Sequence, residues 1–185
     1  NKGNKIVGVM SQRNQEEESP EFADLHSVGT VAQIIRMLKM PDGSTTVIIQ
    51  GKRRFEIVQP LQTDPYMKAI VRMIDEKPFD QKDKQLKVMF KTIKDLALQI
   101  IRDSPNIPSE ASFAIGNIES PTFLVNFISS NMNADVAKKQ EMLEELDISK
   151  RVMKVMEHLT LEIQMLEMRN EIQTKVRKDM DKQQR

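Results

Sequence analysis

Cysteine is absent from this chain of 185 residues, and so is tryptophan. Without thiols the chain can form neither a disulfide nor a thiolate metal site, which fits a reducing compartment such as the cytoplasm. Aromatic residues are also scarce, at 4%, whereas methionine occurs 13 times. Methionine is unbranched and adaptable, so it suits helical cores and also surfaces that accept varied partners. The composition favours a helix-rich protein and leaves a partner-binding role open.

Net charge is nearly absent too. The chain has 28 Lys and Arg against 27 Asp and Glu, and the balance holds on both sides of Pro78, with 11 basic and 10 acidic residues before it and 17 of each after it. Nucleic acids and anionic membranes need clustered positive charge, so we expect neither as the main partner. No apolar run approaches the roughly 18 residues of a membrane-spanning helix, and no signal peptide is evident. We therefore expect a cytoplasmic protein with no membrane partner.

The first 78 residues have the period-two pattern of strands. Apolar runs rich in β-branched residues lie at 4–10, 28–40, 45–58 and 66–74. The middle two flank Pro41-Asp42-Gly43-Ser44, a sequence typical of a hairpin turn. Gly51 interrupts the third run, so we expect a bulge or bend there. The pattern predicts a compact antiparallel β unit, with any helix confined to the loop at 19–26.

After Pro78 the apolar period changes to that of helices. We expect one helix between an Asp80 N-cap and Ser104, and the short helices and the long final helix at 109–118, 121–130, 136–146 and 148–185. Ser120 and Pro121 are typical of a helix start, and Asp147 or Ser149 is expected to cap the last helix. Within 136–146 the polar run 138–141 is expected to be exposed. The predicted organisation is a β unit at 1–78, a bundle of short helices at 79–147 and a long helix at 148–185.

The long helix contains no Pro or Gly and would measure about 55 Å. At 100° per residue it has two apolar faces on opposite sides. The first face comprises Ile148, Val152, Val155, Leu159, Ile163 and Leu166, and the second comprises Leu161, Met165, Met168, Ile172, Val176 and Met180. A coiled-coil seam would keep one phase throughout. We expect the first face to pack on the preceding helices and the second to meet another module or subunit, the alternative being a frayed, partly solvated tail.

The candidate partner-binding residues are Met165, Met168, Ile172, Val176 and Met180.

Few side chains suggest catalytic or ligand chemistry. Lys52-Arg53-Arg54 could bind a small anion or an acidic peptide, or form a charged strand edge that resists aggregation. His26 and His158 are far apart and lack the spacing of metal ligands. No G-x-S-x-G motif is present, and no carboxylate pair stands in an apolar setting. The sequence predicts no catalytic, cofactor or metal-binding residue in this chain.

Three motifs of the β unit carry a resemblance to a known family. They are Val28-Gly29-Thr30-Val31-Ala32-Gln33-Ile34, Met37-Leu38-Lys39-Met40-Pro41-Asp42-Gly43-Ser44 and Val47-Ile48-Ile49-Gln50-Gly51-Lys52-Arg53-Arg54-Phe55. In these the chain resembles the amino-terminal domain of the Lon family of ATP-dependent proteases. The segments 139–144 and 180–185 support the resemblance, the latter being similar to the family segment that leads toward the ATPase module. The segments 106–108 and 127–131 are similar to Lon from the Bacteroides group of bacteria.

The resemblance implies an α+β fold, with an antiparallel, β-rich, PUA-like subdomain followed by an α-helical subdomain that ends in a long helix. It implies a substrate-recognition and oligomer-assembly domain, belonging to a protease that degrades misfolded and regulatory proteins. The partners would be unfolded or tagged proteins and the other subunits of a parent homohexamer. The parent would be a bacterial serine endopeptidase, using ATP and Mg²⁺ in an AAA+ module and a Ser/Lys dyad downstream of this chain.

The family domain opens with a Pro-Leu-Arg strand and a helix ahead of the position of Ile6. Neither is present in this sequence, so we expect a β unit that is incomplete or disordered at its start. Two other functions stay open at this point. One is a non-proteolytic adaptor with a Lon-like client-binding domain, and the other is a nucleic-acid-binding module based on the PUA-like unit.

Overall fold

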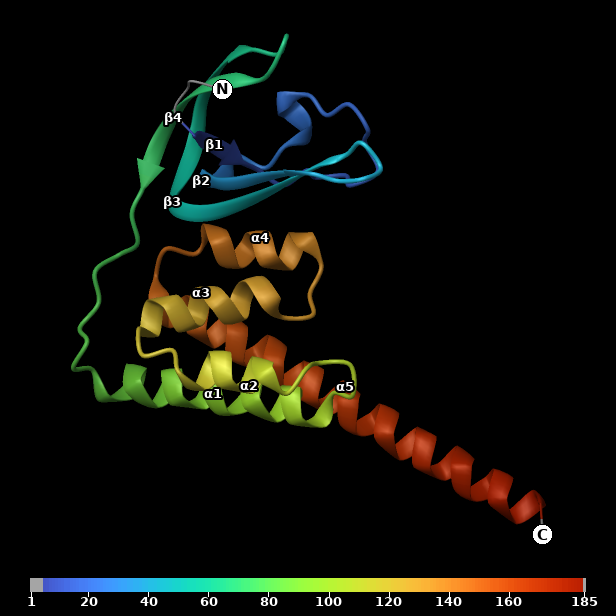
Figure 1. The fold of residues 1–185 in the computed structure, drawn as a ribbon. Coiled ribbons are helices and arrows are strands. Elements are labelled where there is room, and N and C mark those ends of the chain that lie inside the picture. Colours follow the sequence, from blue (N-terminus) through green and yellow to red (C-terminus); the bar gives the residue numbers. More distant parts are fainter. Residues whose placement is uncertain (1–4, 185) are drawn as a thin grey trace. The chain divides into compact units, whose positions relative to one another are not determined.

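A computed structural model describes residues 5–184, which its contacts divide into two compact units. Unit 1 contains the chain up to Glu76 together with Val136–Leu146. Unit 2 contains Lys77–Asp135 and the chain from Asp147 onward. Each unit is described separately below, with the elements labelled as in Figure 1.

Unit 1 is built on a four-stranded antiparallel sheet in the order β1-β2-β3-β4. The strands are β1 (Ile6–Val9), β2 (Val28–Lys39), β3 (Thr45–Gln62) and β4 (Lys68–Ile74), and a short 3-10 turn, η1 (Phe22–Asp24), lies between β1 and β2. The sequence predicted all four strands, although β3 continues beyond its expected end, through Pro60. The part of the first predicted strand at residue 4 lies outside the described residues.

Two glycines set the path of β2 and β3. A Cβ atom on Gly29 would lie 2.4 Å from the backbone oxygen of Val9, so only glycine lets β1 lie this close to β2. At Gly51 the register shifts, because Val31 pairs with Arg53 and Ala32 pairs with Gly51. Lys52 is the extra residue of a β-bulge, as the sequence predicted.

Helix α4 (Val136–Glu144) groups with unit 1 by its contacts, whereas the sequence pattern groups it with the short helices at 79–147. Gln140 was expected to be exposed but is buried at 4%, and its Nε2 donates a hydrogen bond to the backbone oxygen of Val28 at 2.9 Å. Arg54 Nε donates to the backbone oxygen of Leu143 at 2.8 Å, which satisfies a carbonyl near the helix end. Polar side chains make these attachments, so a pattern of apolar residues does not reveal them.

Unit 2 is helical and consists of α1 (Lys84–Asp103), α2 (Glu110–Gly116), α3 (Pro121–Asn131) and α5 (Ile148–Gln183). Ser120 caps α3 and Asp147 caps α5, as predicted. The N-cap of α1 is Asp83 rather than Asp80, because Asp83 Oδ1 accepts hydrogen bonds from the first-turn backbone at 2.9 and 3.2 Å. Asp80 accepts one from the backbone of Lys82, in the turn before the helix.

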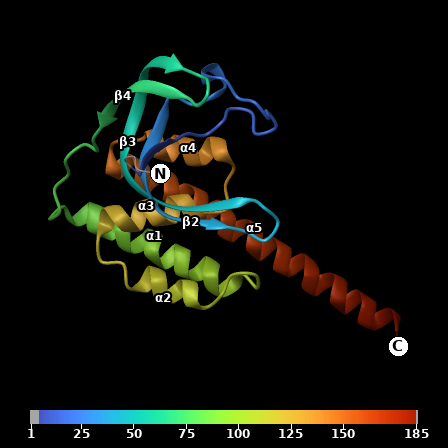
Figure 2. The same ribbon diagram turned by 45° about the horizontal axis from the view of Figure 1, so that its top comes forward.

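The core of unit 2 lies where α1 and α3 pack against the first half of α5. Ile93, Val125, Val152 and Val155 are fully buried there. Arg151 is fully buried as well, and its Nη1 donates to Asn126 Oδ1 at 3.1 Å. The second half of α5 runs past the other helices of its unit (Figure 2). The expected α+β class, an antiparallel sheet followed by helices that end in a long one, is confirmed.

Candidate functional site

The second half of α5 has an exposed apolar surface. We call it the Met face and define it as Leu161, Met165, Met168, Ile172, Val176 and Met180. Each of these side chains is between 51% and 62% exposed. Their spacing of three or four residues places them on one side of the helix, turn after turn. The structure brings all five predicted partner-binding residues together on this strip.

The opposite face of α5 has the reverse burial. Ile148, Val152, Val155 and Leu159 are at most 2% exposed. Ile163, at 9% exposure, is the last buried member of the face, and Leu166 is half-buried. The predicted change of apolar side along the helix is therefore confirmed, and burial passes to exposure between Leu159 and Met168. A helix anchored at one end in its own unit has its other end available for contacts elsewhere.

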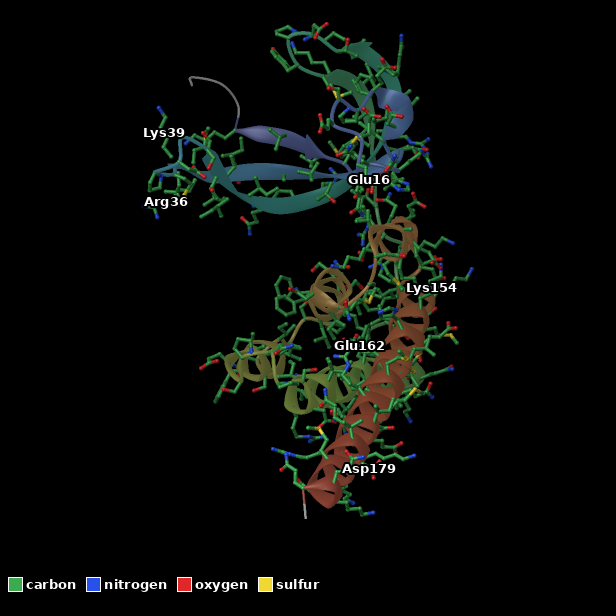
Figure 3. The ribbon with its side chains drawn as sticks, turned by 90° about the vertical axis from the view of Figure 1, so that its right-hand side faces the viewer. Glu16, Arg36, Lys39, Lys154, Glu162 and Asp179 are labelled. Atoms are coloured by element: carbon green, nitrogen blue, oxygen red, sulfur yellow. The ribbon has the colours of Figure 1, made fainter. Side chains whose placement is uncertain are left out.

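A pocket of about 270 Å³ lies inside unit 2 and was not predicted from the sequence. Residues of α1, α2, α3, the segment that follows α3, and α5 line this open pocket. Its walls are largely apolar and include Ala97, Ile100, Ala111, Phe127, Ile128 and Leu159. Glu162 also lines it, and Figure 3 shows this side chain on the side of α5 that faces the shorter helices.

Glu162 has an unusual electrostatic setting. Its Oε2 is buried and has no hydrogen-bond partner among the described residues. Burial raises the pKa of the Glu162 carboxyl above its ordinary value, because the charged form is poorly solvated there, although His158 and a hydrogen bond from the backbone of Asn133 oppose the rise. Sequence reasoning missed this residue, yet a signal was present: at 100° per residue Glu162 falls among Val155, Leu159 and Leu166 of the buried face.

Two of the three basic residues in the run of β3 form ion pairs within unit 1. Arg53 Nη2 lies 2.9 Å from Asp75 Oδ1, and Arg54 Nη1 lies 2.6 Å from Glu76 Oε1. Lys52 Nζ donates to Gln50 Oε1 at 3.1 Å. These contacts favour the structural interpretation of the run over an anion site, and Arg54 also anchors α4.

Residues 5–184 contain neither a cluster of possible metal ligands nor a membrane-spanning helix. No group of three or more His, Asp or Glu in that range could hold a metal ion. His158 Nε2 instead lies 2.8 Å from the backbone oxygen of Asn133. Over the same described range, no helix combines the length and the apolar character that crossing a bilayer requires.

Comparison with known proteins gives consistent matches along the sequence. A family model described as the ATP-dependent protease La (LON) substrate-binding domain matches residues 1–160. The chain is 50% identical over 185 residues to a Lon protease of Flavobacterium johnsoniae, covering 100% of this chain and 23% of that protein. It is 46% identical over 184 residues to a Lon protease of Cytophaga hutchinsonii, again covering 100% and 23%. The chain thus spans about a quarter of the length of these relatives.

Two solved structures have a similar fold. The N-terminal domain of Mycobacterium avium complex Lon protease aligns with a TM-score of 0.61 at 18% identity, over 84% of this chain and 89% of that one. A Lon N-terminal domain protein from Xanthomonas campestris aligns with a TM-score of 0.51 at 11% identity, over 82% of this chain and 88% of that one. These alignments support the α+β architecture.

Proposed function

Because the chain belongs to the family of Lon substrate-binding domains, we propose that it captures unfolded or tagged proteins for an ATP-dependent Lon-type protease and helps that protease assemble. The parent would be a bacterial cytoplasmic serine endopeptidase that degrades misfolded and regulatory proteins, with its ATP, Mg²⁺ and Ser/Lys dyad held in modules outside this chain. The support is the family match over residues 1–160 and the 50% identity to a relative named Lon protease.

The observation that carries the proposal is the Met face. Six apolar side chains stand in a row, each about half exposed, on a helix whose opposite apolar face is buried only in its first half, as far as Ile163. A contiguous apolar surface of this kind usually marks a contact with another chain. Methionine side chains adapt to differently shaped partners, which suits the capture of varied unfolded segments. Weak capture by each copy would be strengthened by avidity in a homohexamer.

The proposal is tested by placing charge on this surface. In the triple variant Met165→Glu, Met168→Glu, Ile172→Glu, binding of a chemically unfolded protein should weaken at least tenfold, because each buried apolar contact is replaced by a charge that must be desolvated. A matched control places the same three added charges elsewhere on the helix, as Gln164→Glu, Asn170→Glu, Thr174→Glu. All three control positions are exposed. The control should bind as the unaltered chain does.

Self-association is measured on the same variants by sedimentation velocity. If the Met face also joins subunits, the first triple variant should shift to smaller species while the control does not. Circular dichroism should show that both variants keep their helix content, because the altered residues lie outside the core. Equal binding by the two variants would exclude the Met face as the capture surface. Absence of any binding by the unaltered chain would exclude substrate capture itself.

A further inference from the structure

The pocket of unit 2 has the size of one side chain. At about 270 Å³ it exceeds a cavity of about 150 Å³ that admits benzene, and it is smaller than most pockets for drug-sized molecules, which begin near 300 Å³. Ala97 and Ile100 from α1, Ala111 from α2, and Phe127 and Ile128 from α3 form apolar walls. Such walls favour an apolar occupant, since apolar side chains make up most of the lining and cannot replace the hydrogen bonds that a polar group makes to water.

One polar atom in this apolar setting lacks a partner. Glu162 Oε2 is buried, and no group of the described residues donates a hydrogen bond to it. A buried oxygen without a donor is costly, and bringing a donor to it recovers free energy. The pocket thus presents two complementary requirements, an apolar volume to be filled and an acceptor to be satisfied.

We propose that this pocket receives one large apolar side chain, such as Phe or Leu, from an extended polypeptide, and that a backbone N–H of the same polypeptide donates to Glu162 Oε2. The chemistry fits because every apolar side chain of a protein is attached within a few bonds to a backbone N–H. A folded protein buries both groups, whereas an unfolded segment exposes both. This inference rests on the proposed function and gives it a second contact, separate from the Met face.

The probe is a short peptide of glycine and serine with one central phenylalanine. Methyl NMR of Ile100 and Leu159 in the 185-residue chain reports its binding, because both side chains line the pocket. We expect saturable shifts at these methyl groups. Replacing the phenylalanine with serine should abolish them, and N-methylation of the peptide backbone should weaken binding about tenfold by removing the donor.

Two variants test the site through two different helices that line it. Ala111→Phe fills the pocket from α2 and should weaken the peptide at least tenfold, while Ala114→Phe, on the same helix but exposed and outside the pocket, is the matched control. Glu162→Met keeps a long side chain but has no oxygen, so it should bind the normal and the N-methylated peptides equally. This second variant keeps the test valid should Ala111→Phe unfold.

The outcomes separate this inference from the proposed function. Unchanged affinity in both Ala111→Phe and Glu162→Met would overturn the pocket site. If both pocket variants still bound an unfolded protein, and only changes to the Met face abolished that binding, the proposed function would stand without the pocket. Weaker peptide binding in Ala111→Phe, with the difference between the two peptides erased in Glu162→Met, supports the pocket site directly.

Discussion

Helix α5 carries one isoleucine in its buried half and another in its exposed half, so the effect of replacing isoleucine with alanine can be compared in the two settings. Ile163 is 9% exposed and Ile172 is 57% exposed, and both lie within Ile148–Gln183. Truncating either one to alanine removes the same three carbon atoms. Any difference between the two variants in the free energy of unfolding therefore reports packing and not residue chemistry.

The expected magnitudes follow from burial. Three buried carbons are worth about 0.8 kcal/mol each, or about 2.4 kcal/mol together. Alanine returns about 0.4 kcal/mol through its higher helix propensity, and a residual cavity adds a further cost. We expect Ile163→Ala to destabilise the chain by about 2–3 kcal/mol. Ile172→Ala should be neutral or stabilising by about 0.4 kcal/mol, because it removes little packing and keeps the propensity gain.

The assay is urea unfolding followed by far-ultraviolet circular dichroism. Tryptophan is absent and only 1 Tyr is present, so intrinsic fluorescence would report poorly on unit 2. For Ile163→Ala the urea concentration at the unfolding midpoint should fall, while the slope of the unfolding free energy against urea concentration stays the same. Similar costs for the two variants would refute the argument, since they would mean that Ile172 is packed in the free chain and that the Met face is unavailable to a partner.

Three other predictions concern single residues. Gly29→Ala should cost about 2–3 kcal/mol in urea unfolding, because its new Cβ would meet the backbone of Val9 at 2.4 Å. Gly51→Ala should cost less, because its Cβ would meet the Thr30 side chain at 3.1 Å and no backbone atom within 4 Å. Asp147→Ala should cost about 1 kcal/mol at pH 7 through loss of the cap. Hydrogen bonds from Ser149 and Lys150 lower the pKa of Asp147 below 3.8. The stability that the ionised carboxylate contributes is therefore present above pH 3.8 and is lost as the pH falls through the folded-state pKa. Asp147→Asn should keep the cap without this loss. The pKa of Glu162 is raised above 4.5, so around that pH the folded state binds more protons than the unfolded state. Stability should therefore fall as the pH rises from 4.5 through the folded-state pKa. Glu162→Gln should flatten this part of a plot of melting temperature against pH.

Strong local patterns made much of the fold predictable. The turn at Pro41–Ser44 combines a proline with a glycine at a φ of 87°, and Ser44 donates from both its backbone and its hydroxyl to Asp42. The two faces of α5 follow from helical spacing alone. In both cases residues close together in the sequence determine the local structure, so the sequence alone is sufficient to predict it.

The errors and omissions arose where distant residues meet. The buried Gln140 donates a hydrogen bond to the backbone oxygen of Val28, more than a hundred residues earlier in the chain. Nothing in the sequence near Gln140 indicates that partner. Glu162 could have been noticed on the buried face, but its pocket requires four helices that only the folded unit 2 brings together. The error at Asp80 has a local cause instead: two aspartates precede α1, and the backbone geometry makes Asp83 the N-cap.

The return of α4 to the sheet has a consequence for synthesis. The ribosome completes β4 at Ile74, yet the helix that covers Val28 and Arg54 begins only at Val136. During the synthesis of the intervening segment, which takes several seconds at about 5–20 residues per second, the sheet lacks this helix. Unit 1 therefore cannot finish folding as the nascent chain emerges, and its completion must wait until most of unit 2 has been translated.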